Sequence, residues 1–459
     1  MKQLALLGGK PVREAPFRSL PFVDEQEVRA VEEAIRAGLF SRFVGSNFSG
    51  TREALRKSSQ ELLTEQAAFS FLGGPNVRRF EADWAKLHEV PYAISVNSAT
   101  SGITAILMAM DIGPGSEVIT TPLSFTATAT AIVAAQATPV FADIDAETLC
   151  LDANSVEQRI GPFTKAILYV HWCGNAGEFD RVQAVARSHG IPVIEDAAQA
   201  PGTTYQGKPL GTWGAAGVFS FSEPKNVMTG EGGMIVTSEE AIAEKCRLIR
   251  NHGEVIPELS DNQEFMRNVV GYNFRMVEIV AAMGWVQTQR LTALNRVRNR
   301  NYQYLSSRLS GLTGLKPQRI THPDSFAAYT AVFLWDQKLT GVSRDLVAAA
   351  LRKEGIPVAT GVGRLMSDHP MFLKKIAYGD SGWPFSAHVE YDPALLPVAH
   401  RVHDQEYLGF FLMGWPNTEK DMDDILLAFD KISKNLSALR CYQKENPAKA
   451  LSYDRGRGR

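Results

Sequence analysis

The feature that most constrains the fold is a regular alternation of short apolar runs with helical segments between Tyr92 and His252. Seven such runs, among them YAISV, EVITT and KAILYVHW, read as strands, and most are separated by segments of helical periodicity. Strands that are apolar along their whole length and alternate with helices are typical of a parallel sheet covered on both faces. The sequence therefore predicts an α/β domain with a mostly parallel seven-stranded sheet.

The pattern changes after about Gly314. A strand (AAYTAVFLW), a helix (SRDLVAAALRKEG), a second strand (IPVAT) and a last helix over 419–436 predict a smaller α+β unit. Before the large domain, the sequence predicts helices over 24–38 and 77–88. We expect four parts: an N-terminal segment, a large α/β domain, a small C-terminal α+β domain and a disordered polar tail, over residues 1–91, 92–313, 314–441 and 442–459.

Composition excludes several classes of function. The 459 residues carry a formal net charge of −2, so no overall field draws the chain to nucleic acid or to an anionic membrane. The sequence contains no apolar run of about eighteen residues, and its start does not resemble a signal peptide. The four cysteines have no paired spacing, which favours a reducing compartment, and the nine histidines show no metal-binding spacing. We therefore expect a cytoplasmic protein without a metal, nucleic-acid or membrane partner.

Residues able to carry chemistry follow four of the predicted strands. Small residues from Asn97 to Gly102 follow YAISV where a helix begins, Phe125 follows EVITT, Asp196 ends IPVIED, and Lys225 follows VFSFS. Ligands of open α/β sheets bind at the carboxyl ends of the strands. Each signal alone has an ordinary explanation, because a serine or threonine can simply cap the helix and Phe125 can belong to the core.

Together the four signals fit one cofactor. A helix N-terminus with free backbone N–H groups suits a phosphate. A buried acid requires a cation or a set of donors, and a lysine amine can form a Schiff base. A phosphate cradle, an aromatic plate, an acid and a reactive amine at one edge of one sheet match pyridoxal 5′-phosphate.

The segment EDAAQAPGTTYQGKPLGTWGAAGVFSFSEPKNVMTGEGGMIVT resembles the signature region of the DegT/DnrJ/EryC1/StrS aminotransferases. These are pyridoxal phosphate enzymes of fold type I that aminate keto sugars and keto cyclitols. The resemblance extends to SATSGITAILMAMDIGPGSEVIT, TPVFADID, GYNFRMVEIVAAMGWVQ and LLPVAHRV, and so to most of the chain. The EDAAQA and GEGG blocks at this spacing are far more specific than a lone glycine motif. The resemblance implies fold type I, with a large domain and a smaller C-terminal domain.

The resemblance also implies roles for individual residues around the cofactor ring. Lys225 would form the Schiff base and later shuttle the proton. Asp196 would pair with the pyridinium nitrogen and keep it protonated. Gln199 would lie near the ring hydroxyl, and Phe125 would stack on the face of the ring.

A second group of residues would hold the phosphate. By the same resemblance, Thr100 and Ser101 would donate backbone N–H groups, and Ser220 would add a hydroxyl. Asn273 matches a family residue that reaches the phosphate of the neighbouring subunit. The resemblance therefore implies a homodimer with shared active sites.

The implied activity is transfer of an amino group from glutamate or glutamine to a keto sugar, nucleotide-linked or free, or to a keto cyclitol. One alternative is a dehydratase or lyase on the same scaffold, although the dehydratase branch replaces the Schiff-base lysine with histidine and this chain keeps Lys225. A second alternative is a non-catalytic protein that binds the cofactor, which the intact lysine, acid and phosphate cradle make the weakest of the three. The sequence does not identify the acceptor.

Two departures from the family pattern concern the substrate. Trp172 and Cys173 in VHWCG stand where leucine and tyrosine are more usual, which would reshape one wall of the site. Residues 41–70 look like an insertion that can form a helix and can cover the site or enlarge a dimer contact. His171 and His369 are further candidates for lining the site, and a structural role is an equal alternative for His171.

Overall fold

The computed structural model describes residues 3–18, 22–43, 51–64, 71–253 and 269–446. Its main sheet has the strand order β1-β9-β8-β5-β4-β2-β3, and β9 alone runs antiparallel to both of its neighbours. The prediction of a mostly parallel seven-stranded sheet is confirmed. The seven strands are β1 (Tyr92–Val96), β2 (Glu117–Thr120), β3 (Thr138–Phe141), β4 (Thr164–Val170), β5 (Val193–Asp196), β8 (Ala216–Ser220) and β9 (Gly233–Thr237).

Helices cover both faces of this sheet. Because a strand points alternate side chains to opposite faces, Ile94 and Val96 of β1 pack with one group of helices and Ala93 packs with the other. The first group includes α5 (Ala99–Ala109) and α9 (Glu240–Arg250). The second includes α4 (Pro75–Leu87), α7 (Ala153–Arg159) and α8 (Phe179–Ser188). The helix α6 (Ala127–Ala134) and a hairpin of β6 (Thr204–Tyr205) and β7 (Lys208–Pro209) complete the large domain.

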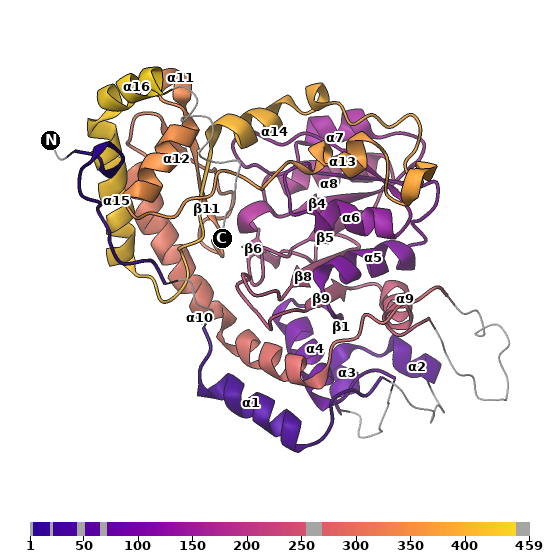
Figure 1. Ribbon diagram of the computed structural model, residues 1–459. Helices are drawn as coiled ribbons and strands as arrows, with labels where there is room; N and C mark the ends of the chain where they lie inside the picture. Colours follow the sequence, from indigo (N-terminus) through magenta and orange to yellow (C-terminus); the bar gives the residue numbers. More distant parts are fainter. Residues whose placement is uncertain (1–2, 19–21, 44–50, 65–70, 254–268, 447–459) are drawn as a thin grey trace.

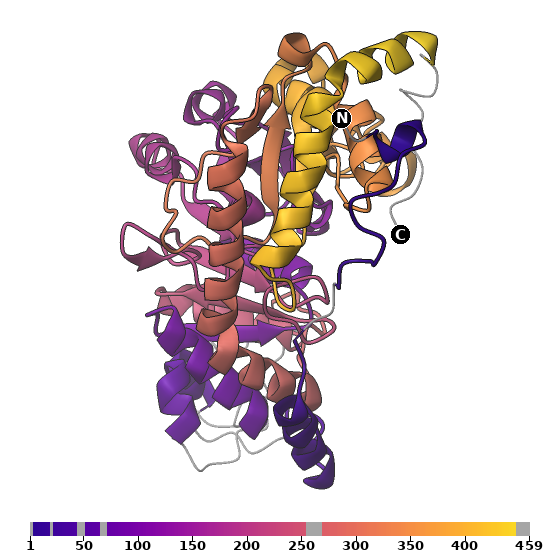
Figure 2. The same cartoon turned by 90° about the vertical axis from the view of Figure 1, so that its left-hand side faces the viewer.

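A single long helix, α10 (Glu278–Leu309), connects the large domain to the small one. In Figure 1 this helix runs from α1 and α4 to the small domain. Figure 2 shows the second half of the helix beside α15. The small domain has an antiparallel sheet of β10 (Leu315–Pro317), β11 (Ala331–Trp335) and β12 (Tyr407–Phe410). Its helices are α11 (Gln337–Thr340), α12 (Arg344–Lys353), α13 (Pro370–Leu373), α14 (Pro397–Arg401), α15 (Glu419–Lys434) and α16 (Leu436–Glu445).

Three local predictions for the small domain differ from the structure. The predicted strand IPVAT forms only one bridge, between Ala359 and Gly409, and Pro357 lacks the N–H that a longer ladder requires. The helix predicted over 419–436 is α15, but it is not the last one, because a further helix, α16, begins after Asn435. The tail was expected to be disordered from Tyr442, but α16 continues to Glu445; residues 447–459 lie outside the described residues.

The N-terminal residues divide between the two domains. Leu4 is fully buried in the core of the small domain, and the backbone N–H groups of Ala5 and Val12 donate to Glu354. Helix α1 (Glu25–Arg36) begins at Asp24 with a capping box and packs on α10. Helices α2 (Thr51–Arg56) and α3 (Ser59–Thr64) lie within the predicted insertion; α2 packs on α9 and α3 on α4. The remaining residues of the insertion, 44–50 and 65–70, lie outside the described part of the chain.

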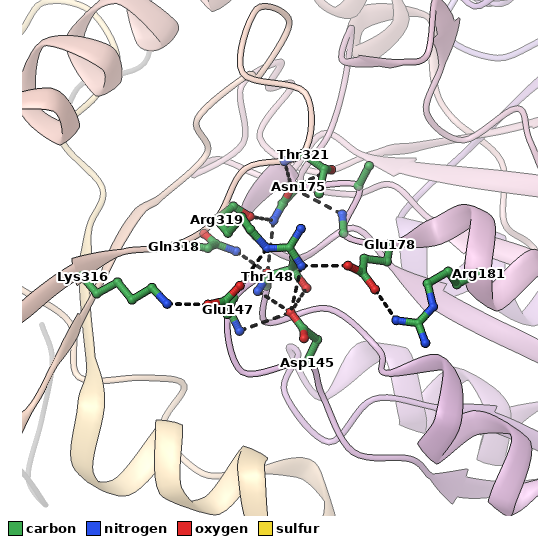
Figure 3. A network of polar contacts seen from close by, with 12 residues as sticks. Asp145, Glu147, Thr148, Asn175, Glu178, Arg181, Lys316, Gln318, Arg319 and Thr321 are labelled. Atoms are coloured by element: carbon green, nitrogen blue, oxygen red, sulfur yellow. Dashed lines mark hydrogen bonds and ion pairs between the residues drawn. The ribbon is translucent and has the colours of Figure 1, made fainter. Parts of the chain in front are cut away.

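A polar network ties the small domain to the loop that follows β3 (Figure 3). Arg319 donates to Glu147 (Nε–Oε2, 3.0 Å) and to Glu178 (Nη2–Oε1, 2.9 Å). The carboxamide of Asn175 donates to the carbonyl oxygens of Arg319 (2.9 Å) and Thr148 (3.1 Å). These contacts hold the small domain beside the carboxyl ends of the strands, where the site lies. Among the described residues, no helix is long and apolar enough to cross a bilayer.

Candidate active site

The candidate site lies at the edge of the sheet where the parallel strands end. β1 and β8 are both antiparallel to β9, so β1 runs in the same direction as β8, β5, β4 and β2. The structure therefore brings the segments that follow these strands to one edge, as predicted from the sequence. They carry the N-terminus of α5, Phe125, His171, Asp196 and Lys225.

Lys225 lies in the turn after β8. Its backbone N–H donates to the carbonyl of Ser222 (2.9 Å), and its Nζ lies 4.5 Å from the centroid of the Tyr329 ring. Burial lowers the pKa of Lys225 to about 8, and the charges of Asp196 and Cys173 oppose this shift. The amine is therefore far more often neutral, and so nucleophilic, than an ordinary lysine amine at the same pH.

Asp196 is the last residue of β5 and is buried. Its Oδ2 accepts a hydrogen bond from Thr128 Oγ1 (2.8 Å), and its Oδ1 accepts from the N–H of Ala198 (3.2 Å). Burial raises the pKa of Asp196, and these two donors, with the more distant charge of Lys225, oppose the shift. No cation of the described residues forms an ion pair with this carboxylate, so a positive group of a ligand would stabilise it.

Gln199 forms a hydrogen bond with Cys173, one of the two residues of VHWCG that depart from the family pattern. The Oε1 of Gln199 accepts from the backbone N–H of Cys173 (2.7 Å), which has a left-handed conformation with φ of 60°. The Sγ of Cys173 lies 3.7 Å from the hydroxyl of Tyr407 in the small domain. Trp172 is buried in the main core. The backbone N–H of Cys173 thus orients Gln199. Through its thiol, Cys173 also contacts the small domain, so this residue lies where the two domains meet.

The predicted phosphate cradle is the N-terminus of α5. Ser98 caps the helix and accepts the N–H of Ser101 (3.1 Å), so that donor is already used by the chain itself. The N–H groups of Ala99 and Thr100 belong to the first turn, where helical partners are lacking. A Cβ atom at Gly233 would lie 2.6 Å from the backbone nitrogen of Ala99. Glycine at this position therefore allows the start of β9 to pack against the N-terminus of α5.

The other predicted cofactor residues differ in their surroundings. Ser220 ends β8 and is buried, with its hydroxyl 3.3 Å from that of Ser222. Phe125 is 71% exposed, although it is a large aromatic side chain beside the site. Asn273 is also exposed, and its backbone oxygen accepts a long contact from Asn97 Nδ2 (3.4 Å). Phe125 and Asn273 thus both leave their side chains free for a ligand or a second chain.

The two candidate histidines do not share one environment. His171 is fully buried, and its Nε2 lies 2.8 Å from Glu195 Oε2. Glu195 also accepts from the N–H groups of Gly211, Trp213 and Gly214, so this pair holds the loop before β8. His369 lies at the start of α13 and is not among the residues that line the cavity at Lys225. The geometry of His171 favours the structural alternative.

Three features of the site were missed from the sequence. The hydroxyl of Thr128 bonds to Asp196, the ring of Tyr329 covers the Lys225 amine, and Arg298 of α10 lines a small cavity with Lys225. Thr128 follows Phe125 closely in TATATAIVAAQ, so the strand-end argument could have included it. The other two come from distant segments and carry no motif.

The comparisons with known proteins agree with this fold. Residues 53–408 match the DegT/DnrJ/EryC1/StrS aminotransferase family, and the chain belongs to that family. It is 33% identical to the spore coat polysaccharide biosynthesis protein SpsC of Bacillus subtilis (strain 168), over 84% of this chain and 93% of that protein. It is 31% identical to the L-glutamine:2-deoxy-scyllo-inosose aminotransferase of Streptomyces kanamyceticus, over 95% of this chain and 98% of that protein.

A solved structure of DesI, determined in the presence of its TDP-sugar product, has the same fold. The TM-score is 0.75 at 25% identity, over 97% of this chain and 99% of that one. Fold, family and relatives together define an aminotransferase of fold type I.

Proposed function

We propose that this protein is a pyridoxal phosphate-dependent aminotransferase that moves an amino group from glutamate or glutamine to a keto sugar or keto cyclitol. One observation carries the proposal: a lysine amine with a lowered pKa and a buried carboxylate without a cationic partner share the ligand-binding edge of the sheet. The family supplies the reaction class, and these two groups supply the chemistry that the reaction requires.

The residues present fit the cofactor. When bound, pyridoxal phosphate supplies an aldehyde and an electron-accepting ring. Lys225 would hold the aldehyde carbon and move a proton at the substrate carbon. Asp196, oriented by Thr128, would hold a proton on the ring nitrogen, and the exposed ring of Phe125 would stack on the cofactor. Gln199 would lie at the ring hydroxyl.

The phosphate would lie at the N-terminus of α5. The backbone N–H of Thr100 and the hydroxyls of Ser101 and Ser220 are the proposed donors, with the positive end of the helix dipole behind them. Ser98 accepts the N–H of Ser101, and the two hydroxyls lie 2.9 Å apart. A hydroxyl can rotate toward a phosphate, so a hydroxyl contact from Ser101 fits better than the backbone contact expected from the sequence.

The acceptor is proposed from the relatives. One is named for 2-deoxy-scyllo-inosose, a cyclitol, and the DesI structure was determined with a TDP-sugar. We therefore propose a keto cyclitol or a keto sugar, nucleotide-linked or free, as the acceptor. A sugar dehydratase is the weaker alternative, because the dehydratase branch lacks the Schiff-base lysine and this chain has Lys225.

We also propose a homodimer in which Asn273 of each chain reaches the phosphate of its partner. Asn273 is exposed, and so is an apolar face of α1. Val28 and Ile35, about two helical turns apart, are 53% and 51% exposed, while a neighbouring face of the helix buries Glu27 against Arg290 of α10. A helix that exposes its apolar face favours a second protein surface against it. Four unpaired cysteines support a cytoplasmic location.

The test is a half-reaction. Apoenzyme loaded with pyridoxal phosphate is mixed with glutamate or glutamine, and the absorbance is followed as the cofactor becomes aminated. Keto acceptors are then added and the product is identified by mass. The expected result is amination of the cofactor by an amino acid and its reversal by a keto sugar or cyclitol, with both steps lost in Lys225→Ala. Absence of any spectral change with a full set of amino acids would contradict the proposal.

A further inference from the structure

We propose that Arg298 binds a carboxylate of the amino-acid donor. This inference rests on the proposed function and adds a residue that determines which donor is used. Arg298 is on α10 and lines the same small cavity as Lys225. The Arg298 side chain and Lys225 therefore border the same space.

Arg298 has no counter-charge in the part of the chain that the structure describes. Burial lowers its pKa to about 10, only partly offset by Tyr329, and no carboxylate contributes. Two other arginines have carboxylate partners: Arg250 meets Glu81 at 2.6 Å, and Arg290 meets Glu27 at 3.0 Å. The buried Arg247 has none in the described chain, but it donates to two backbone carbonyl oxygens, whereas no hydrogen bond is found for Arg298. With a pKa of about 10 the guanidinium is charged at pH 7. A desolvated cation without a partner is costly, so an anion of the ligand would stabilise this position.

The cavity limits the size of that anion. It offers about 30 Å³ of space for the centres of water molecules, and about 10–15 Å³ of such space holds one water. Room for about two waters is enough for a carboxylate group. The aromatic rings of Phe22 and Trp415 and the side chains of Met228 and Leu294 also line the cavity, and none of these adds a charge.

A second polar atom in the cavity is also without a partner. Asn226 is buried and donates through Nδ2 to the carbonyl of Ala327 (3.1 Å) and to Asn295 Oδ1 (3.3 Å), but its Oδ1 has no hydrogen bond. Arg298 and Asn226 thus both belong to the lining of the cavity, and each has an unused hydrogen-bonding group. An amino acid offers the matching pair, a carboxylate and N–H donors, in one small molecule. A free keto sugar or keto cyclitol has no anionic group, and the only anion of a nucleotide-linked sugar is its larger diphosphate, so the carboxylate of the donor is the better match.

Gly414 gives an independent way to move the guanidinium. A Cβ added at Gly414 would lie 2.7 Å from Arg298 Cζ and 2.8 Å from Nη2. Gly414→Ala therefore displaces the end of a flexible side chain while the charge remains. If Arg298 acts by position, this substitution will weaken donor binding without removing any polar group.

The experiment measures the half-reaction at increasing concentrations of L-glutamate and L-glutamine. In Arg298→Met we expect the half-saturating donor concentration to rise about 10- to 100-fold, with the limiting rate within about twofold. Arg298→Lys should recover part of the loss, and Gly414→Ala should raise the half-saturating concentration less. Arg296→Met is the matched control, because Arg296 is exposed on the same helix, and it should behave as the wild type.

Binding of glutarate, which has carboxylates but no amino group, is measured by calorimetry as a readout independent of turnover. We expect wild-type protein to bind it and Arg298→Met to bind it at least about tenfold more weakly. An unchanged half-saturating concentration, a fall only in the limiting rate, or equal glutarate binding by both proteins would each overturn the role. Competition by inorganic phosphate but not by glutarate would also overturn it. If the wild type shows no half-reaction, the proposed function fails, and the glutarate measurement still decides the role of Arg298.

Discussion

The reactivity of Lys225 is the property of this site that can be calculated most directly. Burial lowers its pKa from 10.5 to about 8. A lower pKa means that more of the amine is neutral at a given pH. At pH 7 about one amine in ten is then neutral, against about one in three thousand for an unperturbed lysine, a difference of about 300-fold. The neutral amine is the form that attacks an aldehyde.

The assay is competitive labelling of the apoenzyme with a trace of acetic anhydride between pH 6 and pH 11. The extent of acetylation is read for the peptide that contains Lys225 and for the exposed reference Lys165 by mass spectrometry. We expect the labelling of Lys225 to rise through a midpoint near pH 8. The midpoint, and not the absolute rate, is the quantity compared, because access also affects the rate.

Asp196 supplies an internal control. Its negative charge raises the pKa of Lys225, so Asp196→Asn should move the labelling midpoint below that of the wild type. A midpoint for Lys225 that coincides with that of Lys165 would refute the argument from burial. A midpoint that moves upward in Asp196→Asn would refute the assigned effect of the carboxylate.

Three further outcomes are expected. Asp196→Asn should lower the limiting rate of the half-reaction by about 10²–10³-fold, because the charge acts mainly in the transition state; near-normal turnover would exclude the role. Dimers formed from Lys225→Ala and Asn273→Ala chains should regain activity, because one of their two sites has both residues intact; exchange of chains without recovery would show that Asn273 does not serve the partner. Glu81→Gln should lower the free energy of unfolding by about 3–5 kcal/mol, because it leaves buried Arg250 without a counter-ion, as denaturant titration would measure.

The parts of the site that were predictable from the sequence are those fixed by local position. Asp196 ends one apolar strand and Lys225 lies in the turn after another, and strands that share a direction end at one edge. Their proximity therefore follows from the alternation of strands and helices before any contact is known. The order of the strands is not needed for this argument. The single antiparallel strand, β9, lies on the side of β8 away from β5, so it does not separate the ends of β5 and β8.

The parts that were not predictable depend on packing between distant segments. Tyr329 and Trp415 belong to the small domain, and Arg298 lies in the middle of a 32-residue helix with no motif around it. Its meaning appears only when the cavity and the missing counter-charge are known. The hydrogen bond between Gln199 and Cys173 was not predictable either. It is donated by the backbone N–H of Cys173, which any residue other than proline would provide, and not by the thiol.

The electrostatics of the site lead to one conclusion about how it is organised. Lys225 and Asp196 influence each other's pKa across the site, yet they form no ion pair in the described structure, and Arg298 has no carboxylate partner. Direct pairing of the lysine with the aspartate would hold the amine in its charged form and prevent attack on an aldehyde. Separation leaves each group with an unmet requirement: the carboxylate for a cation, the amine for a carbonyl carbon, and the guanidinium for an anion. A protonated pyridine ring, an aldehyde on the same cofactor and the carboxylate of an amino acid would meet these three requirements together. The proposed cofactor and donor thus account for a buried carboxylate and two half-buried cations that do not neutralise one another.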